Sequence, residues 1–125
     1  MRKLTYKLTA ATLALTAVVL LRAQDPVKVD NKHYKVLFEN DQVRVLRIQY
    51  APGDKSPMHQ HPDSVAVFLA DQRVKFTYPD GKSEEVSAKA GEARWTPAGA
   101  HEPENVGDKP LEVVLVELKA RSGKK

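Results

Sequence analysis

The sequence predicts an all-β domain, closed as a barrel or stacked as a sandwich, in the part of the chain that follows residue 23. Short segments rich in Val, Ile, Leu, Phe and Tyr alternate there with turn residues, and none keeps a helical period. Asp80-Gly81 lies between two such segments and is typical of a β-hairpin. We expect strands at residues 34–39, 43–51, 65–70, 74–78, 84–88, 93–96 and 111–118.

The first 23 residues are interpreted as a secretory signal peptide. A start with three basic residues precedes an apolar run at residues 8–21, which is shorter than the roughly 20 residues that cross a bilayer. The expected cleavage site lies between Ala23 and Gln24, and cleavage would leave a periplasmic or secreted protein that is not held in a membrane. Leu21 is large for its position in such a site, so an uncleaved membrane anchor is the alternative.

Charge and composition exclude several classes of partner. Four of the 20 lysines and arginines, and none of the 16 aspartates and glutamates, lie in residues 1–23, so the rest of the chain is neutral. Nucleic-acid binding by electrostatics is therefore not expected, despite the formal net charge of +4. The absence of cysteine excludes disulfides and thiolate ligands.

A domain of about 100 residues has a small core, which a closed barrel, a bound metal or dimerisation would each help to stabilise.

Turn residues divide the rest of the chain. Residues 24–39 form a polar lead-in and the first strand, and the break at Asn40-Asp41 begins a continuous β-rich region, residues 40–118. Residues 119–125 are a basic tail, expected to be solvated. The chain is thus predicted to contain one domain.

Two histidines stand directly after the turn at Pro52-Gly53. In an extended strand, His59 and His61 would point to the same face and converge on one point. His101, in a segment framed by glycine and proline, is the third candidate metal ligand, whereas His33 stands alone in the lead-in and is not expected to bind. Imidazole suits transition metals such as Zn, Fe, Cu and Ni better than Mg or Ca, and three protein ligands leave positions open for water or substrate.

These residues resemble the two characteristic motifs of the cupin family. Gly53, five residues and then His59-Gln60-His61 are similar to the first motif; Gly91, five residues, Pro97-Ala98-Gly99, His101 and Asn105 are similar to the second. The resemblance implies a cupin-type double-stranded β-helix, a jelly-roll-like barrel over residues 40–118, with a divalent metal (Fe, Zn, Mn, Ni or Cu) at its mouth. It is closest to the small single-domain cupins and implies a small-molecule ligand and a homodimer.

The chain departs from the family pattern where a glutamate usually follows the second histidine. Val65 and Ala66 occupy the two positions concerned. Cupins with three histidines and no glutamate include thiol and diketone dioxygenases, so the departure is compatible with metal binding. Asp63 or Glu104 could supply the missing carboxylate; Glu102 is a weaker candidate because it neighbours His101 and should face the other way.

Alternation along the strand after His61 gives a further expectation. If Val65 takes the glutamate position, its side chain should face the metal, with Ala66 and Phe68 on the opposite face. Trp95 is expected in the core, and Arg94 on the solvated outer face.

Three functions remain open at this point. The first is a metal-dependent enzyme, an Fe(II) dioxygenase or similar, that acts on a small molecule. The second is a non-catalytic barrel that binds or senses a small molecule, with or without a metal. The third is a structural barrel that has lost its metal. Fold alone does not separate them, because one barrel can host unrelated functions.

Overall fold

The computed structural model describes residues 24–120 and confirms the predicted all-β class. The predicted signal peptide and residues 121–125 of the predicted tail lie outside the described residues. The described part contains one short helix and nine strands: α1 (Pro26–Val29), β1 (Tyr34–Glu39), β2 (Val43–Tyr50), β3 (His59–His61), β4 (Ser64–Phe68), β5 (Gln72–Thr77), β6 (Ser83–Ala88), β7 (Ala93–Thr96), β8 (Gly99–Asn105) and β9 (Leu111–Leu118). Within residues 24–120, no helix has the length and hydrophobicity that crossing a membrane requires.

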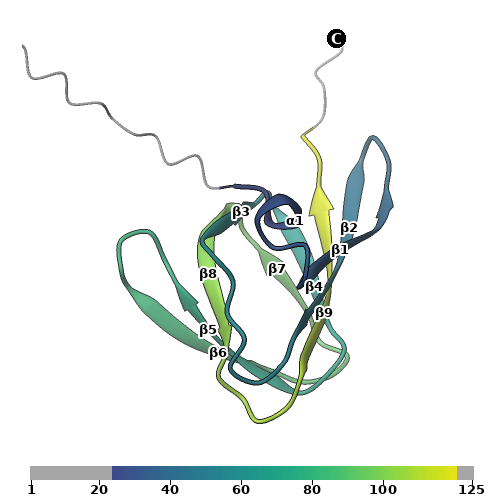
Figure 1. Ribbon diagram of the computed structural model, residues 1–125. Coiled ribbons are helices and arrows are strands. Elements are labelled where there is room, and N and C mark those ends of the chain that lie inside the picture. The colour runs from purple at the N-terminus through teal and green to yellow at the C-terminus, as the bar shows by residue number, and fades with distance from the viewer. Residues whose placement is uncertain (1–23, 121–125) are drawn as a thin grey trace, which may run out of the picture.

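The strands form two antiparallel sheets that face each other, as Figure 1 shows. The order is β1-β2-β9-β4-β7 in the five-stranded sheet and β3-β8-β5-β6 in the four-stranded sheet. Strands distant in sequence therefore become neighbours: β9 lies between β2 and β4, and β8 joins β3 to β5. This crossing of the chain brings residues near position 60 beside residues near position 100.

Each predicted segment overlaps an observed strand, and the hairpin at Asp80-Gly81 is confirmed. Gly81 has φ +83°, a conformation that residues with a side chain rarely adopt, and its N–H donates to the Tyr78 carbonyl. Two strands, β3 and β8, were not predicted. Neither has the run of branched or aromatic residues that indicates a strand, and β8 contains Pro103. Helix α1 was also missed; it is a single turn capped by the side chain of Asp25, which accepts from Val27 N.

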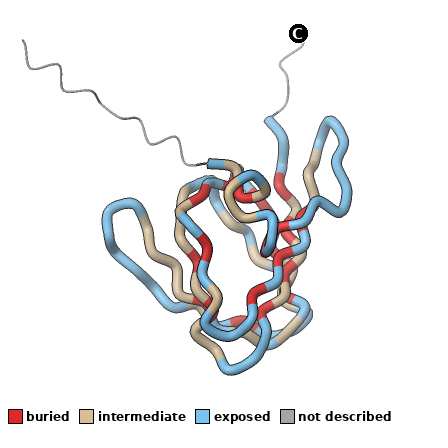
Figure 2. Tube along the Cα trace, viewed as in Figure 1, coloured by how far each residue is buried: buried red, intermediate tan, exposed pale blue. Residues whose placement is uncertain are grey.

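The core lies between the sheets and is built from alternate residues of their strands (Figure 2). Leu46, Leu115 and Ala66 sit side by side on three adjacent strands and are all buried. Burying a leucine side chain contributes about 1.5–3 kcal/mol, so a row of this kind fixes the register of the sheet.

The expected orientation of β4 was wrong, because the residues expected to face the interior and those expected to face away are exchanged. Ala66 and Phe68 face the interior, while Val65 is less buried and pairs with the exposed Trp95. A shift of one residue exchanges the two faces of a strand, so Ala66 is the inward residue of the two that can correspond to the family's glutamate.

Strand β7 corrects two further expectations. Trp95 is 56% exposed and is not in the core, because its neighbours Arg94 and Thr96 take the inward positions opposite Ala66 and Ser64. Arg94 accordingly lies against the interior and not on the outer face, with its guanidinium 5.3 Å from the centre of the Phe68 ring.

Candidate metal centre

The three predicted ligands come together at one end of the barrel. His59 and His61 lie on β3, and His101 lies directly opposite His59 on the adjacent β8. One ring nitrogen from each side chain lies within 4.8 Å of the other two, and the ring centres are 4.9–5.2 Å apart. Gly99 faces His61 across the same ladder, so the cross-strand partner adds no side chain beside that ring. His59 and His61 are buried, and His101 is partly buried.

His61 is oriented by a carboxylate that the sequence did not reveal. The Glu117 carboxylate, on β9 and 2% exposed, accepts a hydrogen bond from His61 Nδ1 over 2.7 Å. Its other oxygen accepts from Arg44 Nε over 2.6 Å, and Arg44 also pairs with Asp25 over 2.8 Å. Because Nδ1 carries the hydrogen, His61 presents the lone pair of Nε2, the arrangement found around metal-binding histidines.

The phase of strand β9 is the signal that could have revealed Glu117. Leu111, Val113 and Leu115 alternate as buried residues, and Glu117 is next in the same phase. A carboxylate on the buried face of a strand requires partners in the interior.

His59 is fixed in the same tautomer by a different contact. Its Nδ1 lies 2.8 Å from the Pro57 carbonyl, which can only accept, so the lone pair is again on Nε2. That nitrogen is 3.0 Å from the hydroxyl of Tyr34, which in turn accepts a hydrogen bond from the Tyr50 hydroxyl over 2.7 Å. Burial raises the pKa of Tyr34 well above its usual value.

The surroundings keep two of the three rings neutral. Burial, together with the neighbouring histidine side chains, lowers the pKa of His59 to about 4 and that of His101 to about 3. Neutral imidazole is the form that binds a metal, so at neutral pH both rings offer lone pairs without first losing a proton. Neutral nitrogens directed at one point fit a transition metal; among residues 24–120, no carboxylate belongs to the cluster.

None of the carboxylates considered as replacements for the missing glutamate joins the histidine cluster, and two of them have other partners. Asp63 accepts a hydrogen bond from Ala98 N over 2.8 Å and so ties the loop between β3 and β4 to the loop between β7 and β8. Glu102 forms an ion pair with Lys55 over 2.7 Å, and Glu104 is not part of the cluster.

His33 does not belong to the cluster, as expected, but it is not a loose surface residue. It is buried between two carboxylates, with Nδ1 2.7 Å from Asp30 and Nε2 2.8 Å from Asp54. Its ring stacks on Tyr50 at 4.4 Å. These two contacts tie the first turn of the domain to the loop that leads into β3.

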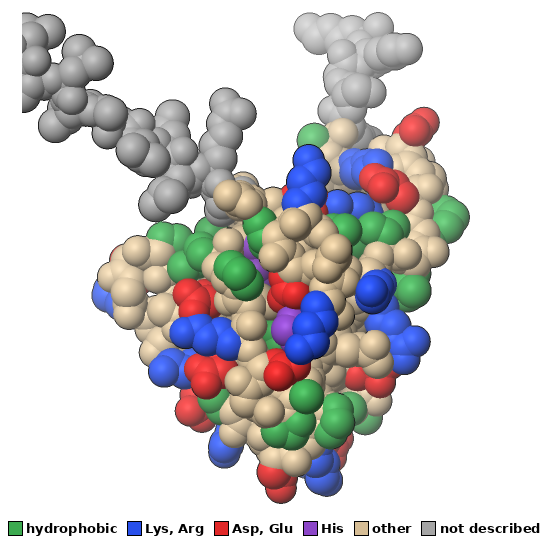
Figure 3. Space-filling model, viewed as in Figure 1, with side chains coloured by type: hydrophobic (Ala, Val, Ile, Leu, Met, Phe, Trp, Pro, Cys, Tyr) green, Lys and Arg blue, Asp and Glu red, His purple; other side chains and the backbone are tan. Residues whose placement is uncertain are grey.

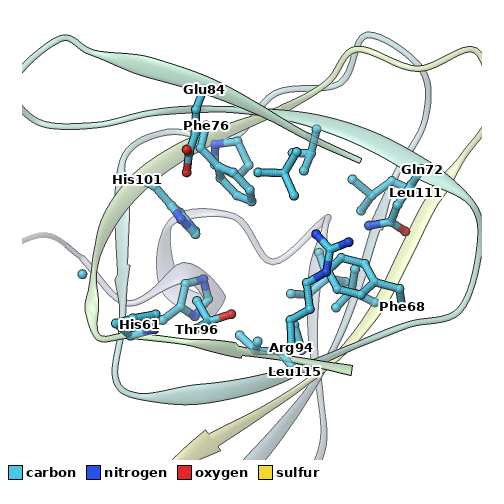
Figure 4. Close-up of a pocket in the computed structure, with 18 of the residues that line it drawn as sticks. His61, Phe68, Gln72, Phe76, Glu84, Arg94, Thr96, His101, Leu111 and Leu115 are labelled. Atoms are coloured by element: carbon cyan, nitrogen blue, oxygen red, sulfur yellow. The ribbon is translucent and has the colours of Figure 1, made fainter. Parts of the chain in front are cut away.

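A cavity of about 530 Å³ extends from the histidines into the barrel. His61 and His101 line one side in Figure 4, with Phe76 stacked on His101 at 4.7 Å. Arg94 reaches in from the other side and donates to Glu92 and to the Ser87 carbonyl. Most of the remaining lining is apolar, with contributions from Ile48, Phe68, Val74, Leu111, Val113 and Leu115.

The fold and the site together are those of a small antiparallel β-barrel with a candidate metal centre. Three convergent imidazoles form this centre at the mouth of an apolar cavity. A family model described as the cupin domain matches residues 46–117, more than half of the 125 residues, and the chain belongs to this family. The predicted resemblance is thereby confirmed. No functionally curated protein matches the chain.

Solved structures of cupins share the fold. A cupin domain from Bordetella pertussis Tohama I is 27% identical, with a TM-score of 0.65, over 70% of this chain and 92% of that one. An uncharacterised protein with a double-stranded β-helix domain from Klebsiella pneumoniae is 21% identical, with a TM-score of 0.57, over 74% and 83% of the two chains. A Cupin 2 conserved barrel domain protein from Salinispora arenicola is also 21% identical, with a TM-score of 0.55, over 74% and 80%. These likenesses support the double-stranded β-helix that the resemblance to cupins implied.

Proposed function

We propose that this protein holds a divalent transition metal with His59, His61 and His101 and brings a small molecule to it in the barrel cavity. The observation that carries the proposal is the cluster itself, three ring nitrogens within 4.8 Å of one another beside a cavity of about 530 Å³. A bound ion of this kind supplies a Lewis acid with positions open to water or substrate.

The chain's own residues prepare the site and select the ligand. Glu117 and the Pro57 carbonyl hold the Nδ1 hydrogens of His61 and His59, so both Nε2 lone pairs face inward. Phe76 and Phe68 line the cavity with aromatic rings, and Thr96 adds a hydroxyl. The positive charge of Arg94 is compensated by Glu92, 2.9 Å away, so the cavity favours a molecule with a largely apolar body.

A dioxygenase-like activity is the catalytic form of this proposal. The protein loaded with Fe(II) should consume oxygen when a suitable thiol or diketone is added, and His101→Ala should not. Tight binding of such molecules by the metal-loaded protein, with no oxygen uptake from any of them, would identify the barrel as a binding or sensing module. The apolar lining of the cavity supports this second function, because no free acid or base other than the histidines stands out among the described lining residues.

We also propose that the mature protein is periplasmic or secreted and forms a homodimer. Export is supported by the charged start and apolar run of residues 1–23. Dimerisation is supported by β1, an edge strand on which Leu37 and Phe38 are each more than half exposed. On the face in Figure 3, acidic and basic side chains are interspersed, which supports a small molecule as the partner in place of a nucleic acid. The molar mass in solution tests the dimer, and a chain that elutes as a monomer contradicts it.

A further inference from the structure

Tyr34 brings a phenolic oxygen to the histidine cluster from a strand that neither cupin motif includes. It lies on β1, before the segment 46–117 that the family model matches. Its hydroxyl is 3.0 Å from His59 Nε2, and the two rings meet at 70° with centres 4.9 Å apart. The side chain is only 2% exposed, so the contact is held inside the domain.

Hydrogen-bond directions show where the hydroxyl of Tyr34 points. The hydroxyl of Tyr50 donates to the Tyr34 oxygen, which leaves the Tyr34 hydrogen free to point at His59. His59 Nδ1 is committed to the Pro57 carbonyl, so the only acceptor on that ring is Nε2. The hydroxyl therefore points at the same lone pair that a metal would use.

The separation between the two atoms matches the spacing of two ligands on one ion. With metal–ligand bonds of about 2.0–2.1 Å, two donor atoms lie about 2.9 Å apart at a right angle and about 3.4 Å apart at a tetrahedral angle. The observed 3.0 Å falls in this range. Ala66, the inward residue at the family's glutamate position, has no metal-binding atom, so a fourth protein ligand has to come from another residue.

We propose that Tyr34 is the fourth protein ligand of the metal centre, replacing the glutamate that the first motif lacks. This rests on the proposed function, because it requires a metal at the three histidines. When the ion binds, the phenol O–H bond breaks, a metal–oxygen bond forms, and the proton passes to solvent. The hydrogen bond donated by Tyr50 then stabilises the phenolate.

Copper provides a direct test, because a phenolate bound to Cu(II) gives a visible charge-transfer absorption that imidazole ligands do not. The wild type, Tyr34→Phe and Tyr50→Phe are each loaded with one equivalent of Cu(II), and bound copper is measured beside the spectrum. We expect the band in the wild type and in Tyr50→Phe. The Tyr50→Phe variant is the matched control, because it also loses a buried hydroxyl, but one that lies one hydrogen bond further from the histidines than that of Tyr34. Tyr34→Phe should bind copper without the band, and its Zn(II) affinity in competition with a chelator should fall roughly 10–100-fold.

The possible failures are distinguishable. Bound copper with no band in the wild type, or a band that survives in Tyr34→Phe, overturns the assignment of Tyr34 and leaves the three-histidine site intact. A wild type that binds no copper at all overturns both this proposal and the proposed function. If Tyr34→Phe does not fold, resonance Raman spectra of the wild-type copper protein decide, since excitation in the band must enhance tyrosine ring vibrations.

Discussion

Replacing Glu117 by glutamine removes the negative charge that orients His61, while the size and shape of the side chain stay nearly the same. Glu117 accepts from two donors, His61 Nδ1 and Arg44 Nε, over 2.7 and 2.6 Å. A glutamine has one carbonyl oxygen and one NH2 group, so it can accept from one of these donors only and turns its own N–H groups toward the other. The site is buried, so water does not replace the lost hydrogen bond.

The expected magnitudes follow from these contacts. An unsatisfied buried donor costs about 1–3 kcal/mol of the free energy of unfolding. For a domain of about 100 residues, each kcal/mol lowers the melting temperature by roughly 4–8 °C. Loss of the carboxylate behind a metal-binding histidine lowers metal affinity by about 10–100-fold, so we expect Glu117→Gln to weaken zinc binding to this extent.

The assay is thermal unfolding of the metal-free protein together with zinc affinity from chelator competition. Glu112→Gln is the matched control, because Glu112 lies on the same strand and pairs with Arg47 on the exposed face. That exposed pair should contribute no more than about 1 kcal/mol and nothing to metal affinity. If Glu117→Gln binds zinc as tightly as Glu112→Gln does, Glu117 does not orient a metal ligand and the reasoning is refuted.

Three further predictions concern pH, the motif position and export. The metal-free protein should lose stability as pH falls from about 6.5 towards 4, because His59 (pKa about 4) and His101 (pKa about 3) stay unprotonated in the folded protein while the same histidines are protonated in the unfolded chain. Urea unfolding at a series of pH values measures this loss. An equally steep decline in His59→Gln would contradict the explanation. Ala66→Glu should destabilise the metal-free protein by about 1–3 kcal/mol and Val65→Glu by less, since only Ala66 faces the interior; melting curves that rank them in the reverse order would contradict this orientation. N-terminal sequencing of protein recovered from an exporting host should begin near Gln24, and an intact Met1 on membrane-bound protein would favour the anchor.

The parts of the fold that follow from local sequence were predictable. Runs of branched and aromatic residues marked the strands around Leu46 and Val113, and Asp80-Gly81 marked the hairpin. Strand β3 was not predicted as a strand, because three polar residues have no pattern to show; it is a strand because it pairs with β8. The phase of β4 was also missed, since Val65 and Ala66 are both compatible with either face until the neighbouring strands are known.

Only the residues of the site that lie within the two sequence motifs were predictable. His59, His61 and His101 stand in recognisable segments, and the structure brings them together. Glu117 and Tyr34 contact the histidines because the two sheets face each other. They lie 56 and 25 residues from their histidine partners in sequence, and local patterns carry no information about such contacts. That these side chains hold a metal remains a prediction.

Metal content is the most direct test of that prediction. The purified mature protein, dialysed against zinc and then against buffer, should retain about one ion per chain by elemental analysis. His59→Ala, His61→Ala and His101→Ala should each lose most of it, because a site with two protein ligands is weak. His33→Gln, which changes the histidine outside the cluster, should retain zinc like the wild type. Equal zinc content in all four variants and the wild type would contradict a metal centre at these three histidines.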